Sequence, residues 1–138
     1  MFLASAVAVI VVDQLTKMLA SRLLAGRQPV RLWPHVHLCY ARNAFGLGGI
    51  RGGGTASLVL WGVSVLVLPL AIWDGHVFSH PAARVAIGAA LGGATSNLYD
   101  RWRRGAVIDF VKVGWWPVFN LADVGITVGA MAAIWFLR

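Results

Sequence analysis

Four apolar stretches restrict what this chain can fold into more than any other feature. Residues 55–73 carry no charge, residues 82–99 carry one arginine, and residues 2–24 and 121–137 carry few charges. Each is close to the roughly 20 apolar residues that an α-helix needs to cross a bilayer. With 59% hydrophobic and 12% charged residues, the composition is also unlike that of a typical soluble domain. The sequence therefore predicts a single polytopic membrane domain, residues 1–138, with four transmembrane helices.

The connections between these stretches differ in length. Residues 74–81 form a short turn, whereas residues 25–54 and 100–120 form two long loops on the same side of the predicted membrane. Apolar residues alternate with other residues between Val30 and Tyr40, and residues 106–113 read as extended, which is typical of strands. We therefore expect an all-α membrane protein: a four-transmembrane-helix bundle with a small extramembrane β-rich element from the two long loops.

Basic residues are concentrated in the two long loops. The chain has a net charge of +7, and these loops contain Arg27, Arg31, Arg42, Arg51, Arg101, Arg103, Arg104 and Lys112. In a membrane protein, anionic lipid headgroups are the expected partner of such residues, and we expect no nucleic acid partner. The positive-inside rule, taken alone, places both long loops in the cytoplasm.

All acidic residues are aspartates, and Asp100, Asp109 and Asp123 lie in or beside the second long loop. A charged side chain at a membrane is costly and is usually functional. Two carboxylates that share a proton can act as base and acid on a water molecule, which is the chemistry of an aspartic peptidase. Each residue also has a structural alternative. Asp109 suits a solvated strand, and Asp123 suits the first turn of a helix capped by Asn120.

Two pairs of polar residues have helical spacing. Asp13 and Lys17 are four residues apart in the first apolar stretch and can form an ion pair that docks this helix. Asn97 and Arg101 are four residues apart at a helix end, where they could hold a substrate carbonyl or a lipid phosphate. Asp100 with Arg101 can equally form an interfacial ion pair.

Five motifs follow one another along the chain: Asp-Gln-x-Thr-Lys from Asp13, Asn-Ala-Phe-Gly from Asn43, Gly-Gly-Ala-x-x-Asn-Leu-x-Asp-Arg from Gly92, Val-x-Asp-Phe around Asp109, and Phe-Asn-x-Ala-Asp up to Asp123. Their order across four predicted spans resembles lipoprotein signal peptidase, also called signal peptidase II, over nearly the whole chain. The resemblance implies a bacterial inner-membrane aspartic endopeptidase that removes signal peptides from diacylglyceryl-modified prolipoproteins.

The resemblance also implies roles for individual residues. Asp109 and Asp123 would form the catalytic dyad. Asn43, Asn97, Arg101 and Asn120 would line the substrate site, and Asp13, Lys17 and Asp100 would support the structure. The expected partners are a lipid-modified prolipoprotein and membrane phospholipid, and we expect a monomer without cofactor or metal. The chain has no glutamate for a His-Glu-x-x-His zinc motif, and His35 and His37 have no evident third ligand.

Three departures from the family pattern leave alternatives open. Asn43 is followed almost directly by Phe45, Ser96 stands where glycine is usual, and the segment from Asp109 to Asp123 is short. A catalytically divergent paralogue and a non-enzymatic lipid-binding scaffold therefore remain the alternatives. The family has cytoplasmic termini and an active site at the outer leaflet, the reverse of the charge count. We follow the family, because arginines beside a site for lipidated substrates could bind phosphate headgroups.

Overall fold

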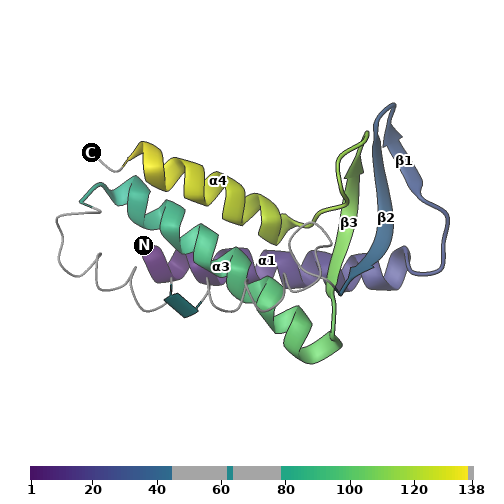
Figure 1. The fold of residues 1–138 in the computed structure, drawn as a ribbon, viewed down its shortest axis with the longest axis horizontal. Coiled ribbons are helices and arrows are strands. Elements are labelled where there is room, and N and C mark those ends of the chain that lie inside the picture. The colour runs from purple at the N-terminus through teal and green to yellow at the C-terminus, as the bar shows by residue number, and fades with distance from the viewer. Residues whose placement is uncertain (45–61, 64–78, 137–138) are drawn as a thin grey trace.

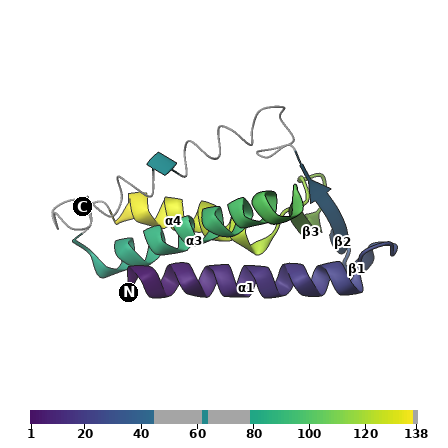
Figure 2. The same ribbon diagram turned by 90° about the horizontal axis from the view of Figure 1, so that it is seen from below.

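A computed structural model of the protein describes residues 1–44, 62–63 and 79–136 (Figure 1). In chain order, its elements are α1 (Phe2–Leu23), β1 (Val30–Trp33), β2 (Val36–Asn43), α3 (Pro81–Arg104), β3 (Val107–Val113) and α4 (Leu121–Trp135). The three helices run side by side, and the strands lie at one end of them (Figure 2). This arrangement brings β3 and the first turn of α4 to the end of the helical layer.

Both ends of α3 are determined by local sequence. The side chain of His80 accepts a hydrogen bond from the Ala82 amide (3.2 Å), and Pro81 occupies the first turn, where a missing N–H is harmless. Gly105 ends the helix in the left-handed conformation, with φ of 70°. The helix therefore extends past the predicted span of residues 82–99, and Asp100 and Arg101 lie on its last turns and not in the loop.

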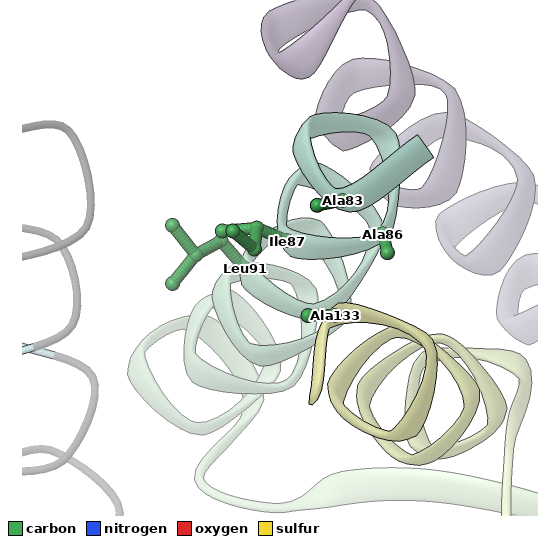
Figure 3. Packing of buried hydrophobic residues seen from close by; sticks show 5 residues of the cluster. All are labelled: Ala83, Ala86, Ile87, Leu91 and Ala133. Carbon is green, nitrogen blue, oxygen red and sulfur yellow. The ribbon is translucent and has the colours of Figure 1, made fainter. Parts of the chain in front are cut away.

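Glycines allow α3 to approach both neighbouring helices closely. A Cβ atom on Gly92 would lie 2.5 Å from the carbonyl oxygen of Ala6 on α1. On the other side, a Cβ atom on Gly129 of α4 would lie 2.5 Å from the carbonyl oxygen of Ala86. The buried apolar cluster of this region is built largely from small residues and comprises Ala83, Ala86, Ile87, Leu91 and Ala133, of which Ile87 and Leu91 point away from α4 (Figure 3). Such backbone approach is typical of helix packing within membranes.

The burial pattern is the reverse of that in a soluble protein. The largest fully buried side chains are polar: Lys17, Asn120, Asp13, Asp100 and Ser96. Many large apolar side chains of α1 and α4 are exposed, including Leu3, Val7, Val11, Leu15, Leu19, Val128, Met131 and Ile134. Contiguous exposed apolar surface of this kind indicates a membrane or a partner. The helices therefore present their apolar residues outward and enclose their polar ones.

The strands form a three-stranded antiparallel sheet in the order β1–β2–β3. Within it, Ala41 of β2 lies opposite Asp109 of β3, and Asn43 lies opposite Val107. The first half of β3, from Val107 to Phe110, is buried, whereas the second half is partly or fully exposed. The small β-rich element predicted from the two long loops is confirmed.

The predicted spans are confirmed in part. In the described part of the chain, α1 is the helix that is both long and apolar enough to cross a membrane, and α4 is a shorter apolar helix. The predicted span at residues 55–73 lies outside the described residues, except for residues 62 and 63. The glycine-rich segment after Asn43, and Phe45 within it, also lie outside them.

Candidate active site

The polar groups of the helices meet where β3 passes the first turn of α4. Backbone hydrogen bonds produce this meeting: the amides of Phe110 and Val111 donate to the Phe119 carbonyl (3.0 and 2.9 Å), and the Phe119 amide donates back to Val111 (3.0 Å). The residue after Phe119 is Asn120, which begins α4. The pairing therefore places Asn120 beside Asp109 on β3.

Asn120 caps α4 as its sequence predicts. Its side-chain oxygen accepts from the Asp123 amide (2.9 Å), and Asp123 Oδ2 accepts from the Asn120 amide (3.2 Å), which is a complete capping box. The capping bonds do not use the Asn120 Nδ2 group, which donates to Asp109 Oδ1 at 2.6 Å. One side chain therefore joins the helix cap that contains Asp123 to the carboxyl group of Asp109.

Asp109 is an unusual strand residue, because it is only 4% exposed. Burial, and next the negative charge of Asp123, raise the pKa of Asp109 to about 6. Side-chain hydrogen bonds from Asn120 and Asn43 oppose this shift, as does the charge of Lys17. The prediction that Asp109 is a solvated strand residue, which was the structural alternative, is wrong. A buried carboxyl group of raised pKa beside a second carboxylate is the arrangement of an acid–base pair.

Asp123 accepts hydrogen bonds on both carboxylate oxygens. Asn97 Nδ2 on α3 donates to Oδ1 (2.8 Å), and the Asn120 amide donates to Oδ2. Asn97 Oδ1 in turn accepts from Asn120 Nδ2 (3.1 Å) and from Lys17 Nζ (2.7 Å). The two asparagines therefore connect both aspartates to α1 and α3.

A buried ion cluster lies directly behind this site. Lys17 Nζ is 2.6 Å from Asp13 Oδ2 and 2.8 Å from Asp100 Oδ2, and all three side chains are fully buried. Asp13 also accepts from Ser96 Oγ (2.7 Å) and from the Ala122 amide of α4 (2.8 Å). The predicted Asp13–Lys17 pair is present, and it docks α1 onto both α3 and α4.

Gln14, Ser96 and Arg104 also belong to this cluster, and the sequence did not predict a role in it for any of them. Gln14 Nε2 donates to Ser96 Oγ (2.9 Å) and to Asp100 Oδ1 (3.1 Å). Arg104 pairs with Asp100 and donates to Gln14 Oε1 (3.2 Å). The available signal for Gln14 was a polar residue between Asp13 and Lys17 in an otherwise apolar span. Arg104 follows Asp100 by one helical turn, but the predicted helix ended before it.

The structure brings most of the predicted site residues together. Asn43, Asn97 and Asn120 all contact one or both of the predicted dyad residues. Arg101 lies on the last turns of α3 and is partly buried. Among the described residues its Nε atom has no hydrogen-bond partner, and no ion pair joins it to Asp109 or Asp123. In the described ranges no three His, Cys, Asp or Glu side chains group as metal ligands.

Trp115 and Trp116 follow β3 at the far end of the sheet from Asp109. They are 89% and 55% exposed. With His35, Val113, Gly114 and Phe119 they line an open, mostly apolar pocket. Indole side chains in such positions favour the membrane–water interface.

Comparison with known proteins assigns this architecture to one family. Residues 5–138 match the family described as Signal peptidase (SPase) II. The lipoprotein signal peptidase of Mycolicibacterium smegmatis is 38% identical, with 97% of this chain and 59% of the relative covered. That of Moorella thermoacetica is 35% identical, with 99% of this chain and 91% of the relative covered. This chain therefore spans about three fifths of the length of the mycobacterial relative and most of the length of the other.

Solved structures give the same result for the fold. A structure described as a bacterial membrane enzyme matches with a TM-score of 0.83 and 27% identity, over 96% of this chain and 84% of the other. A second one of the same description matches with a TM-score of 0.78 and 27% identity. The protein thus has the fold of a bacterial membrane enzyme.

The ion cluster gives a prediction about stability. Asp13→Ala leaves the buried Lys17 with one carboxylate fewer and removes the acceptor of the Ala122 amide. We expect the free energy of unfolding to fall by about 3–5 kcal/mol, the usual cost of breaking a buried pair. Thermal unfolding in detergent measures this, with Thr16→Val as the control, since the Thr16 hydroxyl bonds only its own helix. An unchanged melting temperature together with lost activity would make Asp13 a site residue.

Proposed function

Because the chain belongs to the signal peptidase II family, an aspartic-type endopeptidase family of bacterial membranes, we propose that it removes signal peptides from prolipoproteins with Asp109 and Asp123 as its catalytic dyad. The observation that supports these sites most directly is the Asn120 side chain. It caps the helix of Asp123 and donates to Asp109 Oδ1 at 2.6 Å. Two carboxyl groups that are 14 positions apart in sequence (109 and 123) thus both accept hydrogen bonds from Asn120, Asp109 from its side chain and Asp123 from its backbone amide.

Each aspartate accepts two hydrogen bonds, but their surroundings support different roles. Both Asp123 oxygens accept hydrogen bonds from N–H groups, which favours the ionised form of a carboxylate. Asp109 is less exposed to solvent than Asp123, and its pKa of about 6 favours retention of the shared proton. In the resting enzyme we therefore assign the proton to Asp109 and the negative charge to Asp123.

The reaction follows from these roles. Asp123 takes a proton from a water molecule as the water oxygen attacks the scissile carbonyl carbon. Asp109 donates its proton to the carbonyl oxygen, so that a neutral tetrahedral intermediate forms. When the intermediate collapses, the hydroxyl proton returns to Asp109, and Asp123 delivers its proton to the leaving nitrogen as the C–N bond breaks. The dyad regains its initial protonation, and no other group is consumed.

The substrate proposed here is a prolipoprotein whose lipobox cysteine carries a diacylglyceryl group. Its acyl chains would lie against the exposed apolar surface of the helices, and its peptide would pass the dyad. Arg101 has a buried, unsatisfied Nε atom near the end of α3, which supports a role in holding substrate. Asn43 already bonds Asp109 and would hold the peptide beside it.

We propose the same membrane arrangement as for the family. The single domain would contain four transmembrane helices, with residues 55–73 as the second, in the bacterial cytoplasmic membrane. The sheet and the dyad would face the outer side, and the exposed arginines of the loops would bind phospholipid headgroups. We propose that the chain functions as a monomer.

The first prediction from this function concerns the dyad. Asp109→Asn and Asp123→Asn should each abolish cleavage, because an amide can neither protonate the carbonyl oxygen in place of Asp109 nor take the proton of water in place of Asp123. The measurement is cleavage of a diacylglyceryl-modified prolipoprotein by purified protein in detergent. Asp74→Asn, which lies in the predicted turn on the opposite side, should retain activity. Near-wild-type turnover by either dyad variant would overturn the assignment, and an inactive wild-type protein would favour a divergent paralogue or a lipid-binding scaffold.

The second prediction concerns pH. Asp109 must be protonated to donate to the carbonyl oxygen, so kcat/KM should fall as pH rises through about 6. A bound lipidated substrate buries Asp109 further, and burial is the main cause of its raised pKa. The corresponding decrease in kcat should therefore lie at higher pH than the decrease in kcat/KM. Initial rates between pH 4.5 and 9 test this, and two coincident profiles would contradict it.

The third prediction concerns the side of the membrane on which the dyad lies. A cysteine introduced at Trp115, which is 89% exposed, in a Cys39→Ser background should react with a membrane-impermeant thiol reagent added to cells with a permeabilised outer envelope. A cysteine at Ser79 should react only after the inner membrane is broken. The reverse pattern would place the site in the cytoplasm, as the positive-inside count does, and would exclude processing of exported lipoproteins.

A further inference from the structure

Lys17 has one contact that the docking of α1 does not require. Its buried ammonium group contacts the carboxylates of Asp13 and Asp100, which already form a close pair of anionic partners. The third contact is a hydrogen bond of 2.7 Å to Asn97 Oδ1, a neutral group that leads toward the dyad. An ammonium group has three donors and no acceptor, so these three contacts use its full capacity.

The Lys17 contact determines which way the Asn97 amide points. Because Lys17 can only donate, the oxygen of Asn97 must face it, and Nδ2 must face the opposite way. That nitrogen lies 2.8 Å from Asp123 Oδ1 and donates to it. The orientation of the amide, and with it the donor to Asp123, therefore follows from the position of the lysine.

The same constraint reaches Asp109 through Asn120. Asn97 Oδ1 also accepts from Asn120 Nδ2 (3.1 Å), and Asn120 Oδ1 is occupied by the capping bond from Asp123. The remaining N–H of Asn120 is then directed to Asp109 Oδ1 (2.6 Å). The side-chain oxygen of Asn97 faces Lys17, and that of Asn120 faces the helix cap. Their side-chain nitrogens donate to Asp123 and to Asp109, respectively.

We propose that Lys17 is a positioning residue for the dyad, which holds Asn97 in the single amide orientation that keeps Asp123 Oδ1 a hydrogen-bond acceptor. The inference rests on the proposed function and extends it, since Lys17 would otherwise serve only to hold the helices together. It acts through Asn97 and touches neither substrate nor the reacting atoms.

Loss of the ammonium group should reverse the Asn97 amide. Without Lys17, Asp13 Oδ2 and Asp100 Oδ2 lose the ammonium group that they share, so these carboxylates attract the NH2 group of Asn97. The oxygen of Asn97 then faces Asp123 Oδ1, and two acceptors can share that contact only if the carboxyl group is protonated. The proton would move onto the aspartate that must accept one from water.

Several charged groups surround this contact and determine its pH response. Asp13 on α1 and Asp100 on α3 touch Lys17 directly, and Arg104 on α3 pairs with Asp100. The dyad residues lie beyond Asn97, on β3 and α4. From β2, Arg42 donates to the Arg104 carbonyl (2.8 Å) but is exposed, and Asn43 is neutral. Removal of Lys17 therefore leaves an excess of buried negative charge, which favours the protonated dyad.

The test is Lys17→Met, which keeps the length and apolar volume of the side chain. We expect kcat per folded enzyme to fall roughly 10- to 100-fold, the usual effect of removing a group that orients a site residue. KM should change little, because Lys17 does not contact substrate. The pH–rate profile of the residual activity should move to higher pH.

A second variant separates positioning from stability. Lys17→Met with Asp13→Asn removes one buried charge of each sign, and the new amide oxygen can still accept from the Ala122 amide. This double variant should recover much of the thermal stability lost in Lys17→Met, but kcat should stay low and the pH profile shifted. Ser96→Ala is the matched control: it removes a hydrogen bond to Asp13 within the same cluster, so it should lower stability without moving the pH profile.

Two results would overturn the inference while the wild-type protein cleaves prolipoprotein. One is near-wild-type kcat with an unshifted profile in either lysine variant. The other is recovery of kcat along with stability in the double variant, which would show a purely structural role. An inactive wild-type protein would instead count against the proposed function itself, so the two failures are distinguishable.

Discussion

The rest of the structure depends on the enclosed ammonium group of Lys17. It joins α1 to α3 through Asp100, and Asp13 beside it reaches the first turn of α4 through the Ala122 amide. An uncompensated charge in this position would be very costly, so the three helices must come together for the charge to be buried. At the opposite end, small apolar contacts around Ala83 and Ala133 and the stacking of His80 on Phe136 hold α3 to α4. The polar contacts at one end of the helices therefore determine how the helices pack, and the sheet lies against that end.

A membrane explains why a polar interior suits this fold. Hydrocarbon supplies no drive to bury leucines, so the large apolar residues of α1 and α4 can face outward. Specificity then comes from close backbone contact at glycines such as Gly92 and from hydrogen bonds between buried polar groups. The few polar residues of the helices are for this reason clustered together between the helices. The site and the determinants of helix packing share the same side chains, which makes stability and activity hard to separate by single substitutions.

Local sequence predicted the parts of the fold that local physics determines. The capping of α4 by Asn120, the pairing of Asp13 with Lys17 and the strands of the long loops all depend on neighbouring residues. The contacts of Lys17 with Asn97 and of Gln14 with Asp100 join residues more than 75 positions apart, 17 to 97 and 14 to 100. No periodicity indicates such contacts. The local sequence pattern did not predict the burial of Asp109. The residue that covers it, Asn120, is brought there by the pairing of Phe119 with β3.

That pairing also limits the effect of the short connection on the candidate site. The departures from the family pattern include a short segment between Asp109 and Asp123, which might be expected to disturb a dyad at its two ends. In the structure, however, Phe119 forms backbone hydrogen bonds with Phe110 and Val111, so that the loop ends at β3, one residue before Asn120. Residues 114–118 lie before this pairing, so we expect that a change in their number would not move Asn120. The geometry of the two carboxyl groups is determined by a strand pairing, a helix cap and one buried lysine, and none of these depends on the length of the loop.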